Sequence, residues 1–153
     1  MTAPGDDLDR IMAVMAAAFD PQYGEAWNRR QVEDALLIGN CHYGLVDAGG
    51  SAATGADETA GFFLARTGYE EEELLLLAVD PRFRQRGLGR RLLQSFADAA
   101  RARGARRLLL EMRRGNSAEL LYRNFGFSPI GERPNYYRTP TGQRIDAITF
   151  ALD

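Results

Sequence analysis

The amino-acid sequence predicts an α/β or α+β domain in which a mixed sheet is covered by helices. Segments with helical spacing of apolar residues and short apolar runs typical of strands follow one another in the order ααβββαβαββ. The chain has 153 residues, which is enough for one hydrophobic core of ordinary size. We therefore expect residues 1–153 to form a single domain.

Two helices are expected before the first strand. Asp6 or Asp7 can cap a helix over about residues 8–19. Asn28, with Gln31 three residues later, is a capping-box-like start for a second helix. The Gly-Asn pair that follows is expected to end this second helix.

The middle of the chain is expected to contribute three strands and a long helix. The segments CHYGLVDA, GFFLART and EELLLLAVD are predicted strands, and the continuous apolar run of the third predicts burial on both faces. The segment GGSAATGADETA, between the first two, is expected to be a flexible turn region. Apolar residues follow helical spacing over residues 88–103, and Gly104 is expected to cap that helix.

The last part of the chain predicts a strand, a short helix and a hairpin. The segment RRLLLEM is expected to form a short buried strand that ends at Glu111. The segment SAELLYRNFGF is expected to form a short helix that Gly126 stops. The segments IGERPNYY and DAITFAL are expected to pair through the turn signal TPTGQ.

Charge is divided unevenly along the chain. Residues 1–80 carry fifteen acidic residues and four arginines, whereas residues 81–153 carry six acidic residues and fifteen arginines. The two net charges, −11 and +9, give the overall charge of −2. This division suggests an anionic ligand for the second part and a cationic one for the first. For the acidic part, a solvated face that attracts the basic part is an equally good interpretation.

The composition argues against several classes of protein. Cys41 is the single cysteine and His42 the single histidine, which excludes an internal disulfide and argues against a metal site. No apolar stretch is long enough to span a bilayer, and the acidic N-terminus lacks the basic region of a secretory signal. We expect a reduced, metal-free, cytoplasmic protein. Cys41 is expected to be a small buried residue and His42 to be structural, while Glu70–Glu73 is expected to form a solvated turn or to attract a cationic peptide weakly.

The segment DPRFRQRGLGRRLL, residues 80–93, predicts a binding site for an anion. The first turn of a helix has unpaired N–H groups and a partial positive charge, and glycines let an anion approach the backbone closely. The side chains of Arg84, Arg86 and Arg90 add forked donors suited to phosphate oxygens. A phosphate or pyrophosphate is therefore expected on the backbone of Gln85, Arg86, Gly87, Leu88, Gly89 and Arg90.

The segment lacks two known phosphate-binding motifs, and this limits the kinds of phosphate ligand that it is expected to bind. A Walker A loop requires a lysine and a hydroxyl that are absent here, and a dinucleotide fingerprint requires a third glycine. The spacing Arg84-x-x-Gly87-x-Gly89 fits [RQ]-x-x-G-x-[GA], and it resembles the acetyl-coenzyme-A-binding motif of the GNAT N-acetyltransferases. The alternative is a helix N-terminus with an arginine-rich solvent face. A nucleic-acid patch fits less well, because the chain is acidic overall and the arginines cluster at a glycine turn.

The resemblance covers nearly the whole chain, weakly before Phe62 and strongly from Leu74 on. The segment LLLEMRRGNSAELLYRNFGF is similar to the second signature of the family. The segments EAWNRRQVEDAL and RPNYYRTPTGQRIDAITFAL resemble the RimI-type branch, the ribosomal-protein alanine N-acetyltransferases. The resemblance implies the GNAT fold, with a mixed, mostly antiparallel sheet of roughly six to seven strands flanked by about four helices.

The resemblance also implies residues that would contact the coenzyme. Backbone N–H groups of Leu77, Ala78 and Val79 would polarise the thioester carbonyl where the strand separates from its neighbour. Asn116 would contact the coenzyme as well. It lies six residues before Tyr122, where the family commonly has seven.

Three further residues are implied to act on the reacting groups. Glu111 would accept the proton of the amine, and Tyr122 would protonate the leaving thiolate. One of the strand aromatics Tyr136 and Tyr137 would line the acceptor channel, and we assign Tyr137. The residues alone leave open that Glu111 is a strand-end glutamate paired with Arg113 or Arg114, and that Tyr122 is a core aromatic.

The implied activity is transfer of acetyl from acetyl-CoA to an α-amino group by direct attack. The resemblance suggests the N-terminal alanine of a small-subunit ribosomal protein as acceptor, with no metal, nucleic acid or membrane involved. Two alternatives remain open at this point. The acceptor is a small-molecule amine or a protein lysine in the first, and in the second the chain is a non-catalytic coenzyme-A-binding module. The sequence does not indicate an oligomeric state.

Overall fold

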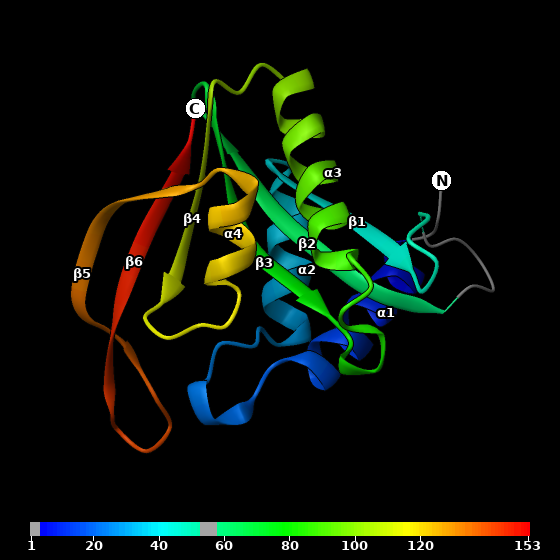
Figure 1. The fold of residues 1–153 in the computed structure, drawn as a ribbon. Helices are drawn as coiled ribbons and strands as arrows, with labels where there is room; N and C mark the ends of the chain where they lie inside the picture. Colours follow the sequence, from blue (N-terminus) through cyan, green and yellow to red (C-terminus); the bar gives the residue numbers. More distant parts are fainter. Residues whose placement is uncertain (1–3, 53–57) are drawn as a thin grey trace.

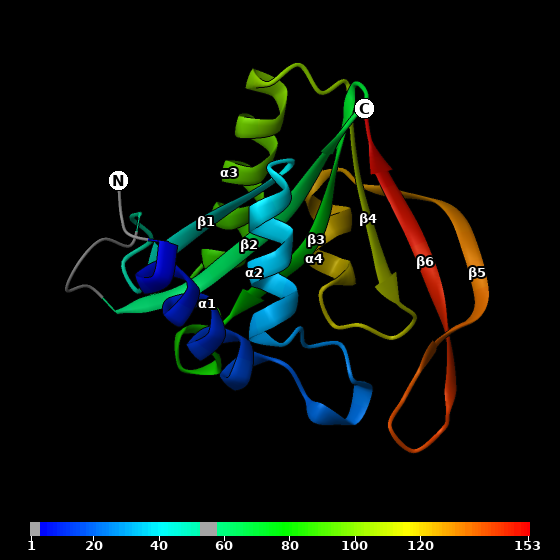
Figure 2. The same ribbon diagram turned by 180° about the vertical axis from the view of Figure 1, so that it is seen from behind.

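A computed structural model describes residues 4–52 and 58–153 and contains the predicted succession of helices and strands (Figures 1 and 2). The helices are α1 (Pro4–Ala18), α2 (Arg29–Ile38), α3 (Leu88–Ala102) and α4 (Glu119–Phe125), with short 3₁₀ helices η1 (Pro21–Tyr23) and η2 (Pro81–Phe83). The strands are β1 (Cys41–Asp47), β2 (Thr59–Gly68), β3 (Glu71–Val79), β4 (Arg107–Arg113), β5 (Ser128–Arg138) and β6 (Arg144–Leu152). No helix of the described residues is long and apolar enough to cross a membrane.

The six strands form one sheet in the order β1-β2-β3-β4-β6-β5. Neighbouring strands are antiparallel except for β3 and β4, which are parallel and are joined through α3. The predicted mixed, mostly antiparallel sheet is therefore confirmed, as is the predicted hairpin of the last two strands.

Helices cover both faces of the sheet. Helices α3 and α4 lie on the face seen in Figure 1, and α1 and α2 lie on the face seen in Figure 2. Phe62 and Phe63, adjacent on β2, point to opposite faces because side chains alternate along a strand. Phe63 packs with Phe96 of α3, and Phe62 packs in a second cluster with Ile11 of α1. The sheet thus separates two hydrophobic clusters. Helix α3 covers the first and helix α1 covers the second.

A β-bulge in β3 changes which cluster this strand supplies. Leu64 of β2 pairs with Leu76 and Ala65 pairs with Leu74, so Leu75 is an extra residue in β3. Leu74 consequently packs in the α3 cluster, whereas Leu76 packs in the α1 cluster. The predicted burial of this strand on both faces is confirmed.

The parallel strands β3 and β4 pair only at their beginnings. Glu71 pairs with Arg107 at the start, and Leu74 pairs with Leu110 at the end. Beyond Leu74, β3 continues to Val79 and pairs only with β2. Strand β4 continues to Arg113 and pairs there with β6, so it extends two residues beyond the predicted end at Glu111. The two strands diverge beyond Leu74 and Leu110, and from there the facing edge of each has no strand partner among the described residues. Two grooves, described below, lie at this divergence.

The start of α1 differs from the prediction. The helix begins at Pro4, so Asp6 and Asp7 lie inside it, and the prediction that one of them caps a helix from about residue 8 is wrong. The buried carboxylate of Asp7 instead accepts hydrogen bonds from the Tyr43 hydroxyl at 2.5 Å and from Arg10 at 3.1 Å. Burial and the hydrogen bond with Asp7 raise the pKa of Tyr43 to about 12. The Asp7 side chain, which the local sequence predicted as a helix cap, instead contacts Tyr43 of β1.

Other boundaries follow the local signals. The Asn28 side chain accepts the Gln31 N–H and the Gln31 side chain accepts the Asn28 N–H, both at 2.8 Å, so the predicted capping box is confirmed. Gly126 ends α4, as predicted. Strand β2 begins at Thr59, earlier than expected, and residues 53–57 of the predicted turn region lie outside the described residues.

The acidic run Glu70–Glu73 is not the solvated turn that was predicted. The Glu72 side chain is fully buried, and the Arg103 guanidinium donates two hydrogen bonds to its carboxylate, at 2.5 and 2.8 Å. Thr67 donates a third at 2.9 Å. Burial alone would raise the pKa of Glu72, but the hydrogen bonds from Arg103 and Thr67 lower it. The carboxylate thus ties β3 to the end of α3.

Replacing Arg103 by glutamine is expected to lower the free energy of unfolding by about 2 kcal/mol, because Glu72 stays buried without its cation. This figure lies below the range for fully buried pairs, since 31% of the Arg103 side chain is exposed. Urea denaturation at neutral pH measures the change, with the exposed Arg101→Gln on the same helix as control. The lowered pKa makes the contribution of Glu72 present at neutral pH and lost as pH falls through its folded pKa. Equal stability of the two variants would contradict this account.

Candidate active site

The loop before α3 has the backbone geometry of an anion cradle. Gln85 and Gly87 both adopt positive φ angles, 63° and 77°, so the chain turns sharply twice before the helix begins at Leu88. Gly87 is the N-cap residue, and no side chain of the described residues caps this helix end. The first N–H groups of α3 are therefore left for water or a ligand.

The three predicted arginines of this loop do not occupy equivalent positions. Arg84 donates a hydrogen bond to the carbonyl oxygen of Ala18 at 3.2 Å, which ties the loop to the end of α1. The guanidinium of Arg90 lies 5.3 Å from the ring centroid of Phe125 and lines the groove described next. The guanidinium of Arg86 lies 5.3 Å from the ring centroid of Phe83 and does not line that groove. The structure therefore brings Arg84 and Arg90 to the site and leaves the Arg86 side chain outside it.

A groove of about 640 Å³ runs from this loop to the divergence of β3 and β4. One wall is formed by β3 and the other by α4 with the end of β4. We name it the coenzyme groove, and most of the predicted coenzyme contacts line it. These are Leu77, Ala78, Val79, Arg84, Gln85, Gly87, Leu88, Gly89, Arg90 and Asn116.

A second groove, of about 300 Å³, opens on the α2 side of the same divergence. We name it the acceptor groove. The predicted residues Glu111 and Tyr137 line it, together with Trp27 of the loop before α2. The two grooves share five lining residues, which mark the place where they meet: Phe19, Glu25, Leu77, Asn116 and Tyr122. Groups brought along the two grooves would therefore meet between β3 and β4.

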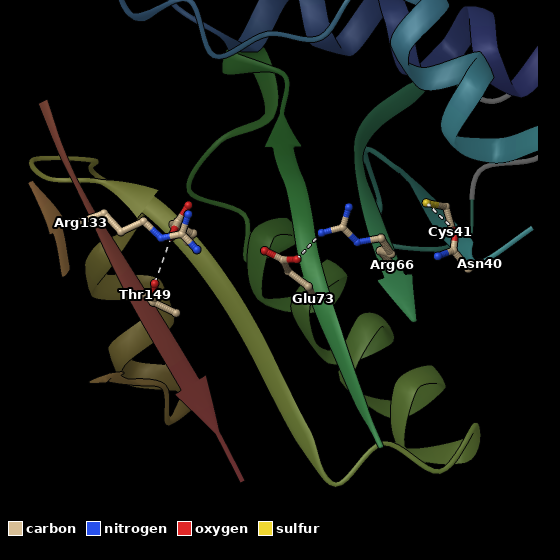
Figure 3. A network of polar contacts seen from close by, with 7 residues as sticks. Asn40, Cys41, Arg66, Glu73, Arg133 and Thr149 are labelled. Carbon is tan, nitrogen blue, oxygen red and sulfur yellow. Dashed lines mark hydrogen bonds and ion pairs between the residues drawn. The ribbon is translucent and has the colours of Figure 1, made fainter. Parts of the chain in front are cut away.

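Glu111 is held by the two strands beyond β4. Its Oε2 accepts a hydrogen bond from the Thr149 hydroxyl at 3.1 Å and forms an ion pair with Arg133 Nε at 3.2 Å (Figure 3). Its side chain is only 16% exposed. The sequence left open a pairing with Arg113 or Arg114, but these two bind other carboxylates. Both contacts of Glu111 use the same oxygen, so Oε1 has no hydrogen-bond partner among the described residues.

Tyr122 is buried but its hydroxyl is not engaged by the protein. The side chain belongs to the α3 cluster, and its ring makes an edge contact with Phe127 at 6.2 Å. Its hydroxyl has no hydrogen-bond partner among the described residues, and it is not among their fully buried unpaired atoms. Burial, and after it the charge of Glu25, raises the pKa of Tyr122 well above its usual value. The phenol is therefore protonated at neutral pH and lies at the junction of the grooves.

Asn116 and Tyr137 both line the grooves. The Asn116 Oδ1 accepts the Ala118 N–H at 2.9 Å, which orients the amide at the start of α4, and the residue lines both grooves despite its shorter spacing. Tyr137 lines the acceptor groove, whereas the neighbouring Tyr136 is 50% exposed and does not. Burial, followed by the charge of Glu111, raises the pKa of Tyr137.

Cys41 and His42 lie on β1, away from both grooves. Cys41 is half-buried and faces Asn40, with Sγ 3.8 Å from the amide oxygen; Figure 3 also shows the Arg66–Glu73 ion pair of the neighbouring strands. Cys41 was predicted to be a small buried residue, and its burial is only partial. Burial raises the pKa of its thiol, and burial followed by the charge of Arg103 lowers the pKa of His42. The described residues contain no cluster of His, Cys, Asp or Glu that would bind a metal ion.

Two charged residues that line the grooves were not predicted from the sequence. Arg113 donates a hydrogen bond from Nε to Glu25 at 2.9 Å, and its guanidinium lies 3.5 Å from the centroid of the Tyr23 ring. Glu25 lines both grooves and Arg113 lines the coenzyme groove. These residues are 88 positions apart, and the available sequence signal was the i, i+2 spacing that puts Arg113 on the same face of β4 as Glu111.

Comparison with known proteins agrees with this architecture. Residues 42–129 match the acetyltransferase (GNAT) domain. The chain belongs to the GNAT family of acetyltransferases. Acetyl-CoA is the co-substrate of this family, and the mixed, mostly antiparallel sheet with its helices is the GNAT fold that the sequence predicted. The chain is accordingly an acetyl-CoA-dependent N-acetyltransferase.

Three individual proteins that are similar to this chain follow. The [ribosomal protein bS18]-alanine N-acetyltransferase of Salmonella typhimurium is 42% identical over 100 residues, which span 65% of this chain and 67% of the relative. The crystal structure of the ribosomal-protein-S18-alanine N-acetyltransferase of Escherichia coli superposes with a TM-score of 0.78 at 29% identity, over 99% of this chain and 90% of that one. A Bacillus subtilis acetyltransferase solved in complex with CoA shares the fold, with a TM-score of 0.69 at 21% identity over 95% of this chain and 91% of that one.

Proposed function

We propose that this GNAT enzyme acetylates the N-terminal α-amino group of alanine in ribosomal protein bS18, with acetyl-CoA as donor. The observation that carries the proposal is the 42% identity to a relative named for that reaction. The geometry agrees with it, because an open acceptor groove with carboxylates meets the coenzyme groove. With a ribosomal acceptor, the reaction would take place in the cytoplasm. We also propose that residues 1–153 form one domain, with both grooves on a single sheet.

The coenzyme groove would hold the donor by its backbone. The free N–H groups at the start of α3, with Arg84 and Arg90, suit a pyrophosphate. Within the part of the chain that the structure describes, the β4-facing edge of Leu77–Val79 has no strand partner, so N–H groups on this edge can donate to the thioester carbonyl and to the oxyanion that forms from it. The Asn116 amide lies close to both grooves and would steady the coenzyme where they meet.

Glu111 and Tyr122 would move the two protons of the reaction. Glu111 Oε1 accepts the proton of the α-ammonium, directly or through a water, and the freed amine attacks the thioester carbon. The new C–N bond forms and gives the oxyanion, the nitrogen releases its second surplus proton to solvent, and the C–S bond then breaks. Tyr122 donates its proton to the departing thiolate, and its raised pKa keeps that proton in place until then. The products are CoA and the N-acetylated protein, and Tyr122 is reprotonated from Glu111 or solvent.

Mass spectrometry tests the acceptor directly. The protein is incubated with acetyl-CoA and a peptide that begins with the N-terminal alanine of bS18, and a gain of one acetyl group on that alanine is expected. A matched peptide with a blocked α-amine and an internal lysine serves as control and should remain unmodified. Acetylation of the control lysine with no change at the alanine would contradict the proposal. Modification of small amines alone would contradict it as well.

A further inference from the structure

Glu25 occupies a position that none of the assigned roles explains. It lies in the loop between η1 and α2, and it lines both the coenzyme groove and the acceptor groove. Its side chain is 18% exposed and that of its partner Arg113 is 13% exposed, so the ion pair is largely withdrawn from water. A loop carboxylate is thereby fixed where the acceptor amine and the thioester would meet.

Glu25 and Glu111 line the same acceptor groove. Glu111 and Arg113 are two residues apart on β4, so both side chains point to the same face and their Cα atoms are roughly 7 Å apart. Arg113 binds Glu25, which holds the second carboxylate on the face of β4 that carries Glu111. Burial and then the charge of Glu25 raise the pKa of Tyr122, and the charges of Glu111 and then Glu25 add to the effect of burial on Tyr137. Both phenols therefore lie within the field of Glu25.

Stability alone does not account for this ion pair. Withdrawing two charges from water costs free energy that their attraction often does not recover, so such a pair is weak support for a fold. Here the Arg113 guanidinium is also stacked on the Tyr23 ring, 3.5 Å from its centroid, which fixes its orientation. The contact from Arg113 occupies Oε1 of Glu25, and Oε2 has no hydrogen-bond partner among the described residues. One oxygen of Glu25 thus remains for a cation in the junction.

We propose that Glu25 binds the α-ammonium group of the acceptor, as a substrate-binding carboxylate separate from the base Glu111. The ammonium would lie between the free oxygens of the two carboxylates, with Glu25 holding it by a charge-assisted hydrogen bond while Glu111 takes a proton. Arg113 is the positioning residue that presents Glu25. This inference rests on the proposed function, because it concerns the amine of the same acceptor.

Binding of two matched peptides tests the inference. One peptide begins with the alanine of bS18, and in the other a lactyl group replaces that alanine, so a hydroxyl stands in place of the ammonium. Calorimetry with the enzyme saturated with CoA measures both dissociation constants. The wild type is expected to prefer the amine peptide by about tenfold, the value of one hydrogen bond to a charged group. Glu25→Gln should reduce this preference to about twofold or less, and Glu25→Asp should restore part of it.

The control variant is Glu33→Gln, which changes an exposed glutamate on α2 and should keep the wild-type preference. A Glu25→Gln variant that keeps the tenfold preference would overturn the inference. Equal weakening of both peptides would also overturn it, because that result indicates a structural role for the loop. If the wild type does not acetylate the alanine peptide, the proposed acceptor fails, and the same comparison is then made with an amine that it does acetylate. Absence of any acetylation would overturn both proposals.

Discussion

Replacing Glu111 by glutamine is expected to lower kcat by about 10²- to 10³-fold, the usual contribution of a general base. The amide keeps the shape of the side chain and can still contact Thr149, but it cannot accept the ammonium proton. The dissociation constant of acetyl-CoA should change by less than about twofold, since Glu111 lines the acceptor groove and not the coenzyme groove. Steady-state release of the CoA thiol measures kcat, and calorimetry measures coenzyme binding.

The pH dependence of the residual activity distinguishes a base from a structural residue. An α-ammonium loses its proton in water with a pKa of about 8, so alkaline solvent supplies the free amine that the variant no longer generates. The rate of Glu111→Gln should therefore rise with pH through that range and recover part of the loss. The matched control is Glu132→Gln, which removes an exposed β5 carboxylate paired with Arg114 and should keep wild-type turnover. Wild-type kcat in Glu111→Gln at neutral pH would remove the base from the mechanism.

Local patterns in the sequence were enough to predict most elements and the loop before α3. Helical spacing, the capping box at Asn28 and the glycine of the turn at Gly87 each depend on residues within a few positions of one another. Such signals survive folding because the groups involved are already neighbours along the chain. The arginines of the loop were predicted as a set for the same reason, and their separate positions were not predicted, because Arg86 is turned away by its contact with Phe83.

The parts that local patterns did not predict depend on contacts between distant segments. The divergence of β3 and β4 is set by where the pairing of Leu74 with Leu110 stops, and no residue type marks that point. Burial of Glu72 requires Arg103, 31 positions away, and Glu25 requires Arg113. In each case a charged residue that looks solvated in the sequence is withdrawn from water by a partner on another element. The burial of Glu72 and Glu25 is the largest difference between the predicted and the observed fold, and Glu25 is the residue that we propose to bind the acceptor amine.

Gly87→Val is expected to weaken acetyl-CoA binding by more than about 100-fold, and by more than Arg84→Ala or Arg90→Ala. A β-branched residue at the φ of 77° costs roughly 1 to 3 kcal/mol of backbone strain, which the loop relieves by moving its N–H groups. A Cβ on Gly87 meets no atom of the described residues within 4 Å, so the expected loss comes from the strained backbone of the turn and not from a clash within the protein. Each arginine contributes one charge at an exposed site, whereas the strained loop carries the whole backbone cradle.

The control must separate loss of the cradle from loss of stability. Gly39→Val is the matched control. Gly39 has a φ of 93° with open space around its Cβ, and this residue follows α2 outside both grooves. Both variants should lose similar stability in thermal unfolding, and Gly87→Val alone should lose coenzyme affinity in calorimetry. A valine at Gly89 is less informative, because its Cβ would approach Leu121 of α4 at 3.1 Å and disturb helix packing. If Arg84→Ala or Arg90→Ala weakens the coenzyme more than Gly87→Val does, side-chain charge and not the backbone of the turn holds the phosphates.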